Sequence, residues 1–114
     1  MSAITTHVLD IARGRPAAGV GVTLEQHAEG HGWREVGRGT TDADGRARDL
    51  LAEGERPGAG GWRLRFAVGH YQAGRGGHSF YPEITIEFTV DEPSHHYHVP
   101  LLLSPFGYST YRGS

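Results

Sequence analysis

Glycine and proline divide this chain into short segments, and their spacing limits the fold more than any other feature of the sequence. The 114 residues include 18 glycines and 6 prolines, which are spread along the whole length rather than gathered in one linker. Between them, apolar and polar side chains alternate in short runs, the pattern of half-buried β-strands. The run Glu83–Val90 is the clearest, since Ile84, Ile86, Phe88 and Val90 share one face. We predict that these four side chains face a core.

The same pattern predicts a series of short strands in a single domain over residues 1–114. We expect strands at Ile4–Ile11, Val20–Gln26, Trp33–Arg38, Trp62–Val68, Glu83–Val90 and His95–Leu103, and a last short strand that ends at Ser114. Helix is limited to at most one turn around His70–Ala73, because the surrounding glycines disfavour a longer one. Seven or eight short strands with little helix predict an all-β antiparallel sandwich, and closure into a barrel is the alternative.

Composition argues against several classes of protein. The chain has no cysteine, which removes disulfides, thiolate nucleophiles and thiolate metal ligands. All 11 basic residues are arginine, so lysine Schiff-base chemistry is absent. A formal net charge of -2 disfavours nucleic acids and anionic membranes as partners, because both attract concentrated positive charge. No apolar run approaches the roughly 18 residues of a membrane span and no signal peptide is visible, so we expect a cytoplasmic protein.

The run His95–Leu103 carries two features that the other expected strands lack. Pro100 cannot donate to a strand ladder, so it predicts either an edge strand or an interrupted ladder. Alternation places His96 and His98 on one face about 7 Å apart, with His95 on the other. Two such imidazoles suit acid–base chemistry or two positions of a zinc site, which would need a third ligand. A solvated polar strand face is the third interpretation, and spacing alone leaves all three open.

Two further residues are candidates for a functional site. His7 lies in mid-strand among apolar neighbours, either as a hydrogen-bonded interior side chain or as the lining of a cleft. Arg46 follows the turn signal Asp44-Gly45, which holds its guanidinium at the exit of a tight bend, either in solvent or aimed at an anionic or carbonyl oxygen. The other histidines next to glycine-rich turns are expected to be exposed and without a role. They are His27, His31, His70 and His78.

Several segments together resemble one known family. They are Thr5–Asp10 near the start, Thr41–Arg46 in the middle, Phe80–Glu83, His96–Pro105, and the terminal Tyr-Arg-Gly-Ser of Tyr111–Ser114. In these segments the chain is similar to the transthyretin-like family of 5-hydroxyisourate hydrolases, from the first strand to the last residue. The terminal Tyr-Arg-Gly-Ser separates these enzymes from the transthyretin hormone carriers. Asp42 stands where the family more often has asparagine, and both residues support the same kind of turn.

The resemblance implies a transthyretin-like sandwich that assembles as a homotetramer, a dimer of dimers, with active sites in the channel at the dimer–dimer interface. The implied reaction converts 5-hydroxyisourate, a small-molecule substrate of urate degradation, to 2-oxo-4-hydroxy-4-carboxy-5-ureidoimidazoline without a cofactor or metal. His7, Arg46 and His98 are the implied catalytic residues: a histidine activates water and the arginine stabilises the oxyanion. Tyr111 and Ser114 join these three in binding the substrate. A transthyretin-like carrier without catalysis is the alternative function.

Overall fold

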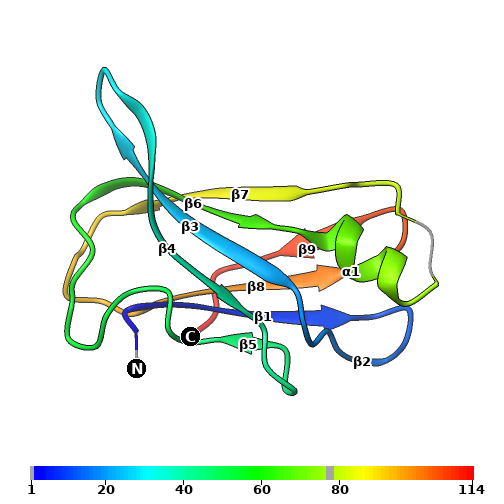
Figure 1. Cartoon of the computed structure of the whole chain (residues 1–114). Coiled ribbons are helices and arrows are strands. Elements are labelled where there is room, and N and C mark those ends of the chain that lie inside the picture. The colour runs from blue at the N-terminus through cyan, green and yellow to red at the C-terminus, as the bar shows by residue number, and fades with distance from the viewer. Residues whose placement is uncertain (1, 77–78) are drawn as a thin grey trace.

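This computed structural model describes residues 2–76 and 79–114. These residues contain nine strands and one helix (Figure 1). In chain order they are β1 Ile4–Asp10, β2 Arg15–Pro16, β3 Gly21–Ala28, β4 Gly32–Thr40, β5 Arg46–Ala47, β6 Gly60–Phe66, α1 Val68–Gly74, β7 Ile84–Val90, β8 Tyr97–Leu103 and β9 Tyr108–Thr110. A strand is present in each segment expected from alternation, but the last one, β9, ends at Thr110 rather than at Ser114. The very short strands β2 and β5 bring the described strands to nine, above the seven or eight expected.

The strands form two sheets, one on each side of the core (Figure 1). One sheet has the order β2-β1-β8-β9, with β5 also paired to β1, and the other has the order β4-β3-β6-β7. The predicted sandwich is confirmed. No ladder joins the two sheets within the described residues, so the barrel alternative is wrong. All pairs are antiparallel except β1 with β8, which run parallel and are connected by a long crossover rather than a hairpin.

Apolar side chains from both sheets fill the space between the layers. Ile84, Ile86 and Val90 of β7 are buried and Phe88 is partly buried, as their alternation predicts. The first sheet contributes buried side chains from β1 and β8, which include Ile4, Val8, Val99, Leu101 and Leu103. Because these residues take the inner face, the positions between them in the sequence point outward. The outer face of β1 and β8 is therefore free to carry polar groups.

Pro100 lies in an internal strand rather than at an edge. Strand β8 is flanked by β1 and β9, so the interpretation of Pro100 as an edge residue is wrong. The interpretation as an interrupted ladder is confirmed. The β8–β9 ladder ends at Leu101 opposite Thr110, and the next pair is an isolated bridge between His98 and Gly113. The two residues between Thr110 and Gly113 do not pair with β8. They lie opposite Pro100, and proline lacks the backbone N–H that a ladder hydrogen bond needs.

The one short helix that the sequence allows is present as α1, and it is tied to β1. At seven residues it makes about two turns, so the expected limit of one turn is wrong. The hydroxyl of Tyr71 donates to Oδ2 of Asp10 at 2.8 Å. Burial and this hydrogen bond raise the pKa of Tyr71, so the phenol stays protonated as a donor. In residues 2–76 and 79–114 there is no helix that is both long enough and apolar enough to cross a membrane.

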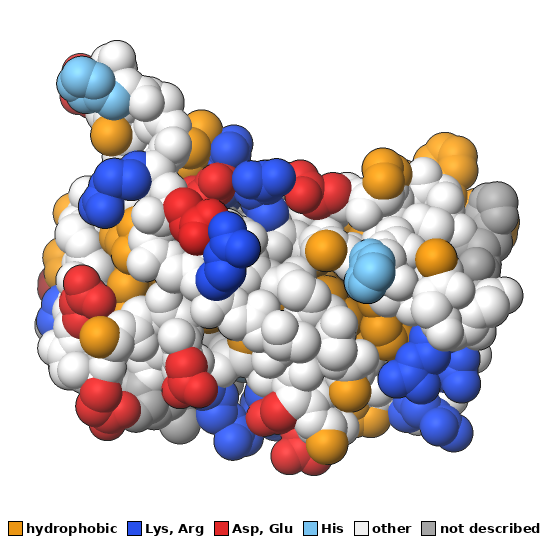
Figure 2. Space-filling view, in the orientation of Figure 1, with side chains coloured by type: hydrophobic (Ala, Val, Ile, Leu, Met, Phe, Trp, Pro, Cys, Tyr) orange, Lys and Arg blue, Asp and Glu red, His pale blue; other side chains and the backbone are white. Residues whose placement is uncertain are grey.

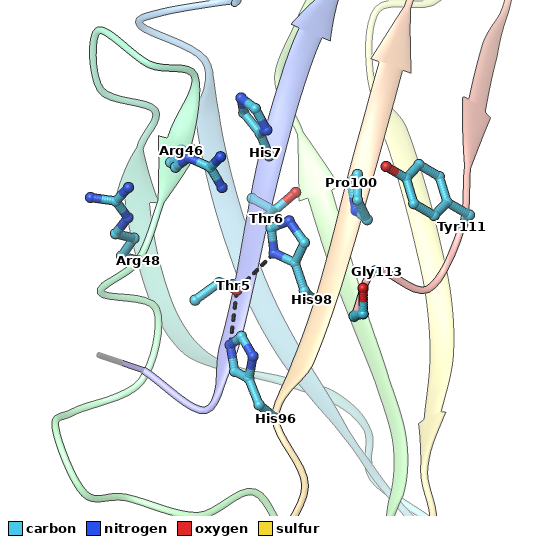
Figure 3. A pocket seen from close by; sticks show the side chains of 11 residues that line it. Thr5, Thr6, His7, Arg46, Arg48, His96, His98, Pro100, Tyr111 and Gly113 are labelled. Atoms are coloured by element: carbon cyan, nitrogen blue, oxygen red, sulfur yellow. Dashed lines mark hydrogen bonds between the residues drawn. The ribbon is translucent and has the colours of Figure 1, made fainter.

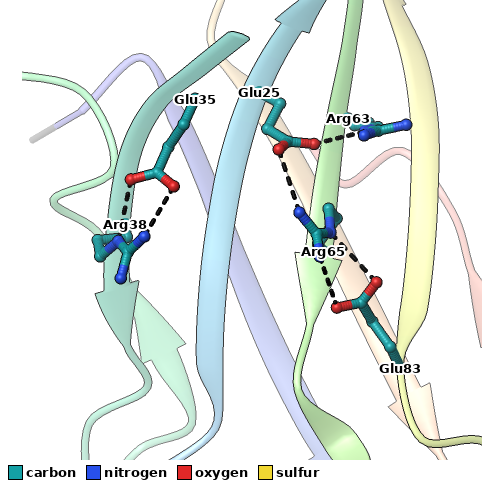
Figure 4. A network of polar contacts seen from close by, with 6 residues as sticks. All are labelled: Glu25, Glu35, Arg38, Arg63, Arg65 and Glu83. Atoms are coloured by element: carbon teal, nitrogen blue, oxygen red, sulfur yellow. Dashed lines mark hydrogen bonds and ion pairs between the residues drawn. The ribbon is translucent and has the colours of Figure 1, made fainter. Parts of the chain in front are cut away.

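Glu25 is a buried carboxylate on the outer face of the second sheet. It accepts hydrogen bonds from Arg63 and Arg65 of β6, and Arg65 also donates to Glu83 (Figure 4). Figure 2 shows acidic and basic side chains next to one another over β3, β4 and β6. Burial by itself raises the pKa of Glu25, but the two arginines outweigh it, and the pKa lies below its ordinary value. The carboxylate thus links β3 to β6 as an anion.

We predict that Glu25→Gln destabilises the protein at neutral pH and weakens its sensitivity to acid. Because the folded pKa of Glu25 is lowered, its contribution to stability is present above the unfolded pKa near 4.5 and is lost as the pH falls through the folded value. The expected loss in unfolding free energy near pH 7 is about 1 to 2 kcal/mol, a modest figure because Arg65 stays partly exposed.

Urea denaturation between about pH 7 and about pH 3 measures both effects. Glu29→Gln, in the exposed turn between β3 and β4, is the matched control. An equal loss in the two variants, or a Glu25→Gln loss that stays constant down to the lowest pH, contradicts the prediction.

Candidate active site

A pocket of about 430 Å³ opens on the outer face of the first sheet, over β1, β5 and β8 (Figure 3). All five residues that the family resemblance implies line it: His7, Arg46, His98, Tyr111 and Ser114. The other lining residues are Thr5, Thr6, Arg48, His96, Pro100 and Gly113. The volume is in the range of small-molecule sites. Residues from the beginning, the middle and the end of the chain meet here.

Strand register brings the polar side chains together. His7 of β1 pairs with Arg46 of β5 on one side and with Pro100 of β8 on the other. Two residues earlier in β1, Thr5 pairs with His98. Side chains at alternate positions of a strand share a face, so all of these groups lie on the outer side of the sheet.

The turn before β5 determines where the side chain of Arg46 starts. Oδ1 of Asp42 accepts hydrogen bonds from the backbone N–H groups of Asp44, at 2.9 Å, and of Arg46, at 3.0 Å. Gly45 has φ 77°, and a Cβ at this position would lie 2.4 Å from the carbonyl oxygen of Val8. Only glycine fits there. The tight bend predicted from Asp44-Gly45 is confirmed, with Arg46 directly after it.

His7 lines this pocket, so the second of the two interpretations that the sequence left open is the correct one. The side chain is partly buried, and Nε2 lies 2.8 Å from the carbonyl oxygen of Asp44. A carbonyl oxygen only accepts hydrogen bonds, so Nε2 carries a proton and the neutral ring has its lone pair on Nδ1. The turn that leads to Arg46 therefore also orients the imidazole of His7.

Thr5 is a site residue that sequence reasoning missed. Its Oγ1 lies 3.0 Å from Nε2 of His96 and 2.8 Å from Nδ1 of His98 (Figure 3). The two rings are stacked, with centroids 6.4 Å apart and planes inclined by 19°. The predicted common side of the two histidines is confirmed, although β8 begins at Tyr97 and His96 precedes it. The signal in the sequence was the position of Thr5, two residues before His7 on the same strand face.

The C-terminal segment packs against His98. The backbone N–H of Gly113 donates to the carbonyl oxygen of His98 at 2.8 Å, and a Cβ on Gly113 would lie 2.6 Å from Cδ2 of the imidazole. Any other residue at this position would push the ring aside. Tyr111, which is 58% exposed, and Ser114 lie at the rim of the pocket. The terminal motif thus contributes a close backbone contact in addition to the two predicted side chains.

Positive charge dominates the pocket. Arg46 and Arg48 both line it, and no Asp or Glu is among the described lining residues. Arg48, two positions after Arg46, was not identified from the sequence. Burial lowers the pKa of His98, and the positive charges of Arg46, His96 and His7 lower it further. An imidazole with a lowered pKa is mostly neutral near pH 7 and can accept a proton.

The remaining histidines do not line this pocket. Three are exposed, as predicted: His27, His31 and His70. His78 lies outside the described residues. Within the ranges 2–76 and 79–114, no three His, Asp or Glu side chains are grouped as metal ligands are. His96 and His98 each direct a ring nitrogen at the hydroxyl of Thr5 instead.

The sandwich and its outward-facing polar pocket define the class of transthyretin-like proteins. The chain belongs to the HIUase/Transthyretin family, whose sequence model matches residues 4–113. The 5-hydroxyisourate hydrolase of Caulobacter vibrioides is 48% identical over 118 aligned positions that cover all of both chains. The solved structure of the Klebsiella pneumoniae 5-hydroxyisourate hydrolase covers all of both chains with a TM-score of 0.86 and 36% identity. Transthyretin from Sparus aurata covers 99% of this chain and 97% of its own with a TM-score of 0.90 and 32% identity.

We predict that the pKa of His98 lies below the ordinary value of about 6.5 and rises in Arg46→Gln. Removal of the guanidinium takes away one of the positive charges that disfavour the imidazolium, while burial still lowers the pKa. An NMR titration of the histidine ring protons measures the shift, and Arg38→Gln on the exposed face of β4 is the control. A wild-type pKa at or above about 6.5, or the same pKa in Arg46→Gln, would contradict the prediction.

Proposed function

We propose that this protein hydrolyses 5-hydroxyisourate to 2-oxo-4-hydroxy-4-carboxy-5-ureidoimidazoline, a step of urate degradation. The observation that carries the proposal is the meeting of two imidazoles, His7 and His98, with the guanidinium of Arg46 in one pocket. In residues 2–76 and 79–114 no carboxylate forms an ion pair with Arg46, so its charge is available to a ligand. The names of the relatives support the same reaction.

The reaction needs an activated water molecule and a stabilised oxyanion. Water adds to a carbonyl carbon of the six-membered ring, the bond from that carbon to the ring nitrogen breaks, and the nitrogen takes up a proton. His98 takes the proton from water, because its lowered pKa keeps it neutral near pH 7. His7 orients the water through the free lone pair on Nδ1, and Arg46 stabilises the negative oxygen that develops on the carbonyl. No covalent intermediate with the protein is required.

The C-terminal segment completes the binding site in this proposal. Tyr111 and Ser114 lie at the rim, where they can contact the substrate and limit the access of bulk water. Exclusion of water strengthens the electrostatic effect of Arg46 on the developing oxyanion. The backbone contact between Gly113 and His98 couples this segment to the proposed base.

A carrier without catalysis is the second candidate function. It is favoured by the structural likeness to transthyretin, whose TM-score of 0.90 exceeds that of the Klebsiella hydrolase. The lining argues against it. Three imidazoles and two guanidiniums suit a polar ligand that develops negative charge better than an apolar one.

We predict that the protein accelerates the decay of freshly generated 5-hydroxyisourate, followed by ultraviolet absorbance. Arg46→Ala is expected to lose about 10² to 10³ in turnover, the usual effect of removing an oxyanion donor. His98→Ala and His7→Ala are each expected to lose at least about 10², because an acid–base group is removed. His27→Ala, on the exposed end of β3, is the control and is expected to retain wild-type turnover.

Treatment of the protein with a metal chelator tests the interpretation of His96 and His98 as zinc ligands. We expect the rate of 5-hydroxyisourate decay to be unchanged by chelation. Decay at the spontaneous rate with wild-type protein would support the carrier instead. Wild-type turnover in Arg46→Ala would remove its assigned role, and loss of activity on chelation, together with one metal ion per chain, would favour zinc.

We also propose that the chain works as a homotetramer, a dimer of dimers that covers the open side of each pocket. Aromatic side chains that are partly or largely exposed adjoin one another in pairs, with ring centroids 4.9 to 6.1 Å apart; they are Phe80, Tyr81, Phe106 and Tyr108. Contiguous apolar surface of this kind favours contacts between chains. Strands β7 and β9 are each the last strand of a sheet, and their outer edges are unpaired within the described single chain.

We predict a mass in sedimentation equilibrium of about four times the 12.4 kDa of one chain. Phe106→Glu puts a charge into the aromatic cluster and is expected to lower the mass, while His31→Glu in the exposed turn is not. A wild-type mass near that of one chain would overturn the shared-channel arrangement.

A further inference from the structure

The hydroxyl of Thr5 is shared by two imidazoles. Its Oγ1 lies within 3.0 Å of Nε2 of His96 and 2.8 Å of Nδ1 of His98, and Thr5 is only 4% exposed. Both rings line the pocket, but His96 is exposed and His98 is partly buried, so the hydroxyl connects an outer ring to an inner one. Figure 3 shows Nδ1 of His98 turned toward Thr5 and the other ring nitrogen on the side of the pocket where His7 and Arg46 lie.

One hydroxyl proton can serve only one of the two rings. If Thr5 donates to His98, then Nδ1 of His98 is bare and the proton of the neutral ring is on Nε2, toward the pocket. If Thr5 donates to His96, then Nδ1–H of His98 donates to Oγ1 and Nε2 presents a lone pair to the pocket. In a third arrangement both rings donate to Oγ1, which leaves the buried hydroxyl proton without either imidazole as acceptor. The proton positions on the two rings are therefore linked through Thr5.

The charges around His98 favour the second arrangement. The guanidinium of Arg46 on β5 lines the same pocket as the ring, and after burial its charge is one of the causes that lower the pKa of His98. A nearby positive charge interacts favourably with a lone pair on Nε2 and unfavourably with an N–H at the same place. His7 of β1 also lines the pocket, and its Nε2–H is already used by the carbonyl of Asp44.

We propose that His96 is a positioning residue that acts through Thr5 on the tautomer of His98. Nδ1–H of His98 donates to Oγ1 of Thr5, the hydroxyl of Thr5 donates to Nε2 of His96, and His96 carries its own proton on Nδ1. In this arrangement Nε2 of His98 faces the pocket as a proton acceptor. The consequence for turnover rests on the proposed function, in which His98 is the base.

Imidazole nitrogen shifts of the full-length ligand-free protein, labelled with 15N and studied by NMR above the pKa values of both rings, test the proposal directly. We expect wild-type His98 and His96 both to be protonated on Nδ1. In His96→Ala the hydroxyl of Thr5 loses its acceptor and turns to His98, so the proton of His98 moves to Nε2. His96→Gln, whose side-chain oxygen can accept from Thr5, is expected to restore Nδ1–H, and His95→Ala, the exposed neighbour, is expected to change nothing.

Turnover of 5-hydroxyisourate provides the second measurement. The kcat of His96→Ala is expected to fall about 10- to 100-fold with KM within about twofold, the range known for loss of the partner that orients a metal-bound imidazole. His96→Gln is expected to recover most of it, and His95→Ala to match wild type.

Wild-type His98 protonated on Nε2, wild-type His96 protonated on Nε2, or an unchanged His98 tautomer in His96→Ala would overturn the proposal. The nitrogen shifts do not depend on any substrate. If the tautomers behave as expected and 5-hydroxyisourate is not hydrolysed, only the proposed function fails. If hydrolysis occurs and the tautomers do not respond, only the role of His96 fails.

Discussion

The parallel ladder between β1 and β8 is the constraint on which the site depends. It sets Thr5 beside His98 and His7 beside Pro100, while β5 adds Arg46 on the other side of His7. A slip of one residue in this register would turn the outer side chains toward the core and the apolar ones toward solvent. The buried side chains between these positions, such as Val8, therefore hold the polar groups in place by occupying the inner face. Core packing and site geometry are two consequences of the same register.

Charged side chains are arranged differently on the outer faces of the two sheets. On the second sheet the carboxylate of Glu25 bonds Arg63 and Arg65, and opposite charges lie close together. On the first sheet the pocket holds two guanidiniums and several imidazoles with no described carboxylate among its lining. Like charges at short range cost free energy, which the core and the strand ladders must offset. The benefit is chemical: burial and the same charges lower the pKa of His98, which favours its neutral form.

The fold of the family does not by itself select a function. A hydrolase and a transthyretin align with this chain with TM-scores of 0.86 and 0.90, so the sandwich is compatible with both. In this chain the pocket is formed by outer-face side chains and by the C-terminal segment that packs on His98, rather than by the core. The isolated bridge between Gly113 and His98, and the gap in the ladder opposite Pro100, bring that segment to the pocket. A change of a few residues on this face can change what the pocket recognises while the core stays the same.

The sequence by itself determined the short strands, the presence of one short helix and the bend before Arg46, because alternation and turn chemistry are local. It also pointed to the pocket residues, but only through likeness to a family, since nothing local connects His7 with Arg46 or His98. The parallel β1–β8 pairing, the internal position of Pro100 and the placement of Thr5 between two imidazoles were decided by the tertiary structure alone. Each of these depends on which strands become neighbours, and that choice is made by the burial of apolar faces far apart in the chain rather than by any short stretch of residues.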